Sequence, residues 1–184
     1  MKKTKNTEEP KAATLALAMI VKSDKEETEL LERCLRYVAT YVDKIFITVT
    51  TKNGLVYEPM IEMLNQYGAE ISYFEWEYDF AKVRNFNFKQ VPKDYDYILW
   101  LDADDVVKNG HRLEVLMQNM EKGNKAADMI VMDYLYDFDE NKICTVKHLK
   151  TRIVRNDDCV EWIGSIHEDF NQLRVVTSLY CQDI

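Results

Sequence analysis

The chain of 184 residues is long enough for one substantial hydrophobic core and short for two, so we expect a single domain. Its 47% hydrophobic and 30% charged residues are the balance of a globular protein and exclude a disordered chain. A formal net charge of -8 excludes a surface built to neutralise nucleic-acid phosphates, because such binding requires clustered lysine and arginine. An acidic protein that binds a phosphate compound needs a local basic patch or a bound metal.

The cysteines and the apolar segments indicate a compartment. Cys34, Cys144, Cys159 and Cys181 form no closely spaced pair, which favours reduced thiols over a zinc site or a disulfide framework. The longest apolar stretch, 15–21, is too short to span a bilayer, and the polar first residues lack the layout of a signal peptide. We therefore expect a cytoplasmic protein without a transmembrane segment, in which residues 1–12 form a flexible tail and residues 13–184 the domain.

Strands and helices alternate along the first two thirds of the chain. Apolar and β-branched runs predict strands at 14–21, 44–50, 70–76 and 97–101, and apolar residues at helical spacing predict helices at 26–41, 59–67, 80–91 and 111–122. Pro59 begins the second helix and Gly68 closes it. This alternation predicts an α/β fold with a mostly parallel, Rossmann-like sheet flanked by helices.

The last third of the chain follows a different pattern. Two β-rich segments, 128–138 and 142–149, are joined by a short polar turn and predict a hairpin, and 151–155 predicts a further strand. The C-terminal β portion is therefore expected to be antiparallel. An aromatic stripe on the first of these strands, formed by Tyr134, Tyr136 and Phe138, is interpreted as core or rim packing and not as a stacking platform.

The strongest local signal is Asp102-Ala103-Asp104, which follows a buried apolar strand directly. Ligands of open α/β sheets bind beyond the carboxyl ends of the strands, and in an extended segment Asp102 and Asp104 point the same way. Two such carboxylates can contact one Mg²⁺ or Mn²⁺, or divide a ribose and the cation between them. The alternative interpretation is that one of these residues only caps a helix.

Two other segments carry groups suited to a phosphate ligand or to proton transfer. Between a strand and a helix, Arg84 offers a fork of donors that suits phosphate, and Asp79 can accept from a base or ribose or simply cap the helix. Near the end of the chain, His167 can bind metal, and Glu168 and Asp169 can act as bases. By itself this last segment is equally typical of a solvated surface.

A second phosphate chemistry remains open at the aspartate motif. The run 102–107 also resembles the first motif of haloacid-dehalogenase-type phosphatases, in which the first residue, here Asp102, is the nucleophile. These enzymes need a later acidic pair after glycine, which the chain lacks, and their first motif usually opens the domain. A non-catalytic module that binds sugar nucleotides is the remaining alternative.

Taken in order, five segments resemble family 2 glycosyltransferases. They are 18–22, 31–35, Asp79-Phe80-Ala81 with Arg84-Asn85-Phe86, the run 99–105 around Asp102-Ala103-Asp104, and Ile166-His167-Glu168. The resemblance implies a GT-A-like fold, a nucleotide-diphosphate sugar donor, Mn²⁺ or Mg²⁺, inversion at the anomeric carbon, and a glycan, lipid-linked or protein acceptor.

The resemblance also implies roles for the residues. Asp102 would contact the ribose and share in the metal site, Asp104 would hold the metal, and Arg84 and Asp79 would contact the nucleotide. Glu168 is the first candidate for the base and Asp169 the second, and His167 would contact the metal or the phosphate.

The sequence departs from the family in two places. The segment after the second strand, 49–54, lacks the aspartate that usually contacts the base or ribose, so the nucleotide base is not predicted. The chain ends soon after the His-Glu motif, where relatives continue, and we therefore expect a truncated or minimal domain.

Overall fold

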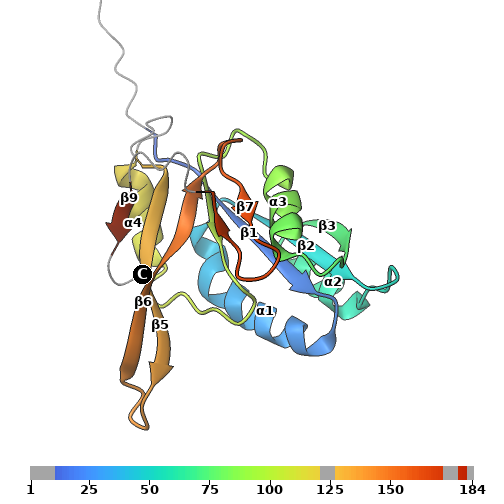
Figure 1. The fold of residues 1–184 in the computed structure, drawn as a ribbon. Helices are drawn as coiled ribbons and strands as arrows, with labels where there is room; N and C mark the ends of the chain where they lie inside the picture. The colour runs from blue at the N-terminus through green and yellow to red at the C-terminus, as the bar shows by residue number, and fades with distance from the viewer. Residues whose placement is uncertain (1–10, 121–126, 172–177, 182–184) are drawn as a thin grey trace, which may run out of the picture.

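The computed structural model describes residues 11–120, 127–171 and 178–181, which form a seven-stranded sheet with helices on both faces (Figure 1). The strands of this sheet are β1 (Leu15–Lys22), β2 (Lys44–Thr51), β3 (Glu70–Glu75), β4 (Tyr97–Trp100), β5 (Met129–Phe138), β6 (Cys144–Arg155) and β9 (Ser178–Cys181). The helices are α1 (Lys25–Val38), α2 (Glu58–Gln66), α3 (Phe80–Gln90) and α4 (His111–Asn119), with a 3-10 turn η1 (Ala39–Tyr41). Two short strands, β7 (Trp162–Ile163) and β8 (Asp169–Phe170), pair separately.

The strand order of the described sheet is β3-β2-β1-β4-β6-β5-β9. Strands β1 to β4 are mutually parallel, whereas β6 runs antiparallel to both β4 and β5. The predicted α/β class with a mostly parallel sheet is confirmed, and the predicted antiparallel C-terminal portion consists of β5 and β6, whereas β9 runs parallel to β5. The separate strand predicted at 151–155 is wrong. This segment continues β6, because Ile153 pairs with Leu99 of β4 on one side and with Ile130 of β5 on the other.

Side-chain alternation along the central strands builds two cores. On β1, Leu15, Leu17 and Met19 face α1, α2 and α4, whereas Ala16 and Ala18 face the opposite core under α3. Small alanine side chains leave room for α3 to pack on β1 and β2 (Figure 1). The helices therefore cover both faces and leave the carboxyl ends of the parallel strands open for a site.

The predicted helices are all present, with shifts of one to three residues at their ends. The aspartate at position 24 caps α1 by accepting from the Glu27 amide at 2.9 Å, and Gly68 ends the α2 segment with a φ of +65°. The predicted end of the fourth helix at 121–122 and positions 1–10 of the predicted tail lie outside the described residues. No helix within the described ranges is long and apolar enough to cross a membrane.

The β5–β6 hairpin extends beyond the rest of the sheet as a two-stranded ribbon (Figure 1). Its turn is closed by Asp139, whose carboxylate accepts from the amides of Asn141 and Ile143. Along the ribbon, Tyr136 is 67% exposed and Phe138 42%. Of the predicted core or rim packing, the core option is therefore wrong for these two members of the aromatic stripe, and the rim option remains.

Candidate active site

The Asp-Ala-Asp motif forms a tight turn at the carboxyl end of β4. The Asp105 amide donates to the Asp102 carbonyl at 3.1 Å, and the Asp102 amide donates to the Asp105 carboxylate at 2.9 Å. This turn leaves Asp104 exposed, while Asp102 and Asp105 are half-buried. Arg33 of α1 also stabilises the turn, because its guanidinium donates to the Asp104 carbonyl at 3.0 Å. The two aspartates of the motif therefore have different environments.

Arg84 of α3 joins two of the sequence motifs. Its Nη2 lies 2.7 Å from Asp102 Oδ1 and its Nε 2.8 Å from Glu168 Oε1. The Arg84 side chain is only 7% exposed, and its guanidinium packs over the rings of Trp100 and Trp162 at 4.8 and 5.0 Å. The predicted residues Arg84, Asp102 and Glu168 thus meet in one partly buried cluster, although they come from distant parts of the chain.

Two further cations, which the sequence analysis missed, surround the same carboxylates. Arg152 of β6 lies 2.7 Å from Asp105 and 3.4 Å from Asp102, and Lys150 lies 3.8 Å from Asp102. Both side chains lie over the rings of Trp100 and Tyr134, so they share one face of β6. No sequence signal marks these two residues as part of the site, because their place beside Asp102 depends on the pairing of β6 with β4.

Burial raises the pKa values of the aspartates in the turn, whereas the neighbouring cations lower them. For Asp102, burial disfavours the charged form, but the charges of Arg84 and Arg152 outweigh it and hold the pKa below its ordinary value. For Asp105, burial outweighs the attraction of Arg152 and raises the pKa. Burial and the neighbouring Arg152 lower the pKa of Lys150. Of these two acids, Asp102 is therefore the one whose charged form the protein stabilises.

The segment carrying the His-Glu motif is tied to α3. Asn85 accepts from the Trp162 amide and donates to the Trp162 carbonyl, both at 2.8 Å, and the Phe80 amide donates to the Ser165 carbonyl at 3.1 Å. His167 is exposed and has a φ of 56°, a left-handed conformation that non-glycine residues rarely adopt. These ties bring Glu168 to Arg84.

Three other predicted residues lie outside this cluster. Asp79 caps α3 by accepting from the Lys82 amide at 2.9 Å, which confirms the alternative prediction that this residue caps the helix. Asp169 is exposed and accepts from the Phe170 amide at 2.7 Å. Among the described residues, no hydrogen bond or ion pair joins Asp79, His167 or Asp169 to Arg84. No group of three metal-capable side chains is found in the described part of the chain.

A pocket of about 570 Å³, here called the strand-end pocket, opens beyond β1 and β2. Its lining includes Ser23, Glu27, Thr51, Trp76 and Phe80. The loop after β2 is the segment where the sequence lacks an expected aspartate. The Glu75 carboxylate stabilises this loop by accepting from the amides at positions 53 and 54 and from the Thr51 hydroxyl. The pocket is mainly apolar, with its aromatic wall formed by Trp76 and Phe80, whose ring centroids are 4.8 Å apart.

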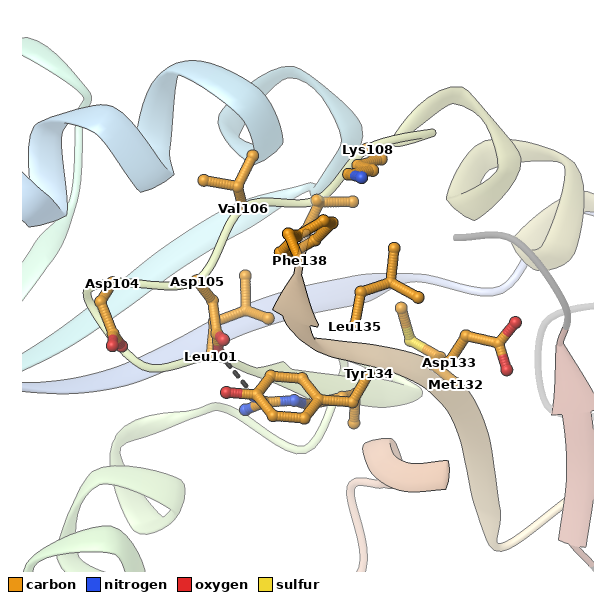
Figure 2. Close-up of a pocket in the computed structure, with 12 residues that line it drawn as sticks. Leu101, Asp104, Asp105, Val106, Lys108, Met132, Asp133, Tyr134, Leu135 and Phe138 are labelled. Atoms are coloured by element: carbon orange, nitrogen blue, oxygen red, sulfur yellow. Dashed lines mark ion pairs between the residues drawn. The ribbon is translucent and has the colours of Figure 1, made fainter. Parts of the chain in front are cut away.

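A second pocket of about 260 Å³, here called the hairpin pocket, lies between the segment following β4 and strand β5. Figure 2 shows Tyr134 and Phe138 of β5 beside Asp105 and Lys108, with Asp104 at the edge of the view. The dashed line marks the ion pair of Asp105 with Arg152. Asp104 lines this pocket, and its charge also acts on Glu27 of the strand-end pocket. It therefore lies within electrostatic reach of both pockets.

The aspartate turn follows the parallel strand β4, and the strand-end pocket opens beyond β1 and β2 of the same sheet, which is where α/β domains with open sheets bind their ligands. The sequence profile described as Glycosyl transferase family 2 matches residues 26–173. The chain therefore belongs to glycosyl transferase family 2. The expected GT-A-like class and the expected enzyme class, glycosyltransferase, are those of this family.

Solved structures with a related shape are distant in sequence. S. aureus TarS 1-349 is 14% identical, with a TM-score of 0.48 over 65% of this chain and 35% of that chain. Its complex with UDP-GlcNAc gives the same identity and TM-score over 65% and 34%. A 4-diphosphocytidyl-2C-methyl-D-erythritolsynthase from Anaerococcus prevotii DSM 20548 is 12% identical, with a TM-score of 0.49 over 78% and 70%.

The chain thus spans about a third of the length of these TarS chains. Among curated proteins no match to this chain is found.

Proposed function

We propose that this chain is the donor-binding and catalytic domain of a metal-dependent inverting glycosyltransferase. It moves a sugar from a nucleotide-diphosphate sugar to an acceptor hydroxyl on a glycan, a lipid-linked compound or a protein. The observation that supports this most is the Arg84 guanidinium between Asp102 and Glu168. It unites a carboxylate suited to the donor with one suited to a base, and the strand-end pocket, which is large enough for a nucleoside, opens beyond β1 and β2 of the same sheet.

In this proposal the nucleoside occupies the strand-end pocket, which at about 570 Å³ falls in the range typical of small-molecule sites, roughly 300–1,000 Å³. Trp76 and Phe80 offer apolar contact to the base, and Asp79 at the start of α3 a carboxylate to base or ribose. Asp102 contacts the ribose. Arg84 contributes to nucleotide binding by positioning Asp102. Arg84 can contact a phosphate directly only when one of its ion pairs, with Asp102 or with Glu168, opens.

Asp104 is the first candidate for the metal. Its side chain is exposed and makes no ion pair with any residue that the structure describes, whereas both oxygens of Asp102 face cations. Mg²⁺ is usually held by one or two carboxylates together with substrate phosphates, so the residues present fit such an ion. Asp102 and His167 are the further ligands in our proposal. A bound cation would neutralise the charge that develops on the leaving diphosphate.

Glu168 is the proposed base, with Asp169 as the second candidate. Arg84 fixes the orientation of the Glu168 carboxylate, which is 16% exposed and can still be reached by a substrate. The acceptor O–H bond breaks and its proton passes to Glu168. A new bond forms between that oxygen and the anomeric carbon, and the bond from this carbon to the diphosphate breaks. Attack opposite the leaving group inverts the anomeric centre.

The phosphatase alternative is weaker because of the surroundings of Asp102. A nucleophilic carboxylate needs a free oxygen, but Arg84 contacts one oxygen of Asp102 and Arg152 approaches the other. We also propose a cytoplasmic location, which the free thiols Cys34 and Cys144 support.

A thermal-shift panel of UDP, GDP, CDP and ADP, with and without Mn²⁺, tests the donor part of the proposal. A nucleotide at 100 times its Kd adds about 2.7 kcal/mol to stability. For a chain of this size that raises Tm by about 5–11 °C, at about 2–4 °C per kcal/mol. UDP-GlcNAc, present in the TarS complex, is the first sugar nucleotide to test.

We expect one nucleotide to stabilise the protein only when Mn²⁺ is present. Stabilisation that does not depend on the metal would refute the metal assignment. Release of inorganic phosphate from simple esters would favour the phosphatase, and nucleotide binding without turnover would favour a binding module.

A further inference from the structure

Lys150 of β6 is the most loosely paired cation of the ion-pair network. Its Nζ lies 3.8 Å from Asp102 Oδ2, near the upper limit for an ion pair, whereas Arg84 and Arg152 each have a contact of 2.7 Å with a carboxylate. The Lys150 side chain is 38% exposed, compared with 7% for Arg84 and 4% for Arg152. Of these three cations, Lys150 is therefore the one that a ligand reaches most easily.

The contact between Lys150 and Asp102 can open without leaving Asp102 unpaired. Asp102 Oδ1 keeps Arg84 at 2.7 Å, and Oδ2 keeps Arg152 at 3.4 Å. Releasing either arginine is less favourable, because their other partners, Glu168 and Asp105, are only 16% and 10% exposed and would lose the cation that neutralises them. The exchange of a carboxylate for a phosphate is therefore easiest at Lys150.

Two aromatic rings fix the position of the Lys150 ammonium group. Its Nζ lies 4.9 Å from the ring centroid of Trp100 and 5.0 Å from that of Tyr134. The donor site proposed above places the ribose at Asp102, and the diphosphate is attached to the ribose through the 5′ carbon. An ammonium group in contact with Asp102 is therefore within side-chain reach of the phosphates.

The chemistry of a lysine suits a diphosphate leaving group. An ammonium group binds phosphate oxygens as a compact charge with three donors. When the bond between the anomeric carbon and the diphosphate breaks, its electron pair stays on the phosphate oxygen. A cation that is already in place stabilises this developing charge.

We propose that Lys150 contacts the diphosphate of the donor directly and stabilises it as the leaving group. The inference rests on the proposed glycosyltransferase function. It makes Lys150 a catalytic residue of the transfer and leaves Arg84 to position Asp102 and Glu168.

The experiment uses the whole chain and isothermal titration calorimetry in the presence of Mn²⁺. The ligands are UDP, GDP, CDP and ADP, together with the four corresponding nucleosides. Lys150→Met removes the charge but keeps an apolar stem, and Lys150→Arg keeps the charge. The control is Lys108→Met, because Lys108 is also exposed and also lies over an aromatic ring, 4.8 Å from the centroid of Phe138 on the hairpin.

We expect Lys150→Met to weaken the binding of the best-bound diphosphate at least about tenfold, equivalent to about 1.4 kcal/mol, and to leave the binding of its nucleoside unchanged. Lys150→Arg should bind the diphosphate more tightly than Lys150→Met does, and Lys108→Met should bind it as the unaltered protein does.

Unchanged diphosphate affinity in Lys150→Met, or an equal loss in Lys108→Met, overturns the inference. So does an equal loss for the nucleoside, because Lys150 would then act only through Asp102. If no diphosphate binds the unaltered protein, the proposed function itself fails. Diphosphate binding that does not depend on Lys150 refutes the inference alone.

Discussion

Replacing Arg84 by alanine should destabilise the fold and not only weaken ligand binding. The guanidinium is 7% exposed and pairs with Asp102 and Glu168. Breaking a buried ion pair by removing one partner costs about 3–5 kcal/mol, because the other charge stays buried. Asp102 keeps Arg152 nearby and is 34% exposed, so most of the loss comes from Glu168. We therefore expect the lower end, about 3 kcal/mol, or a fall in Tm of about 6–12 °C.

A double-mutant cycle that combines Arg84→Ala with Glu168→Gln, measured by urea denaturation, isolates the interaction energy between Arg84 and Glu168. In the unaltered background Glu168→Gln should destabilise, because Arg84 loses a charged partner. In the Arg84→Ala background it should be neutral or stabilising, because it removes an unpaired buried charge, and a coupling of about 1–3 kcal/mol results. The exposed pair of Arg36 with Glu32 is the control, where Arg36→Ala should cost less than about 1 kcal/mol. Equal effects of Glu168→Gln in both backgrounds would refute this account of Arg84.

Three further predictions concern single carboxylates. Asp104→Asn should abolish the Mn²⁺-dependent part of nucleotide stabilisation in the thermal-shift assay and leave the fold intact, because the side chain is exposed. Glu168→Gln should retain nucleotide affinity but lower transfer by about 10²–10⁴-fold in a rate assay; full activity would shift the base assignment to Asp169. The pKa of Asp102 is lower in the folded protein than in the unfolded chain. Its charge therefore contributes stability that is fully present above the pKa of the unfolded chain and is lost as the pH falls through the pKa of the folded protein. Below about pH 4, Asp102→Asn should therefore lose less stability on acidification than the unaltered protein, and equal acid sensitivity in urea denaturation would contradict this.

The fold was largely readable from the sequence because each element has a clear period and clear ends. Strand β1 is a continuous apolar run, as expected of a strand buried on both faces, and Gly68 marks the end of the α2 segment. The extent of β6 was missed because it depends on pairing with β4 and β5 at once, which is a property of the whole sheet.

The site was predictable only where several functional residues lie close together in the sequence. Asp102 and Asp104 follow one strand, so their common location needs no tertiary information. Arg152 could not be assigned from neighbours in sequence, since its partners are 47 and 50 positions away and meet it through the β4–β6 pairing. Arg84 was found as a cation suited to phosphate, but its burial against Trp100 and Trp162, and hence its role in holding carboxylates, follows from packing.

The charges of the site bear on how an acidic chain could bind a diphosphate. Arg84, Lys150 and Arg152 contribute three positive charges to the ion-pair network, and Asp102, Asp105 and Glu168 contribute three negative ones, so the network is formally neutral. The three cations of the network are already paired with carboxylates. They therefore attract a diphosphate only weakly unless one of these ion pairs opens. Asp104 remains outside the network with a net negative charge that repels a diphosphate by itself but attracts a divalent cation. A divalent cation held by Asp104 would offset that repulsion, and for this reason we make Asp104 the first candidate for the metal, with Asp102 and His167 as further ligands.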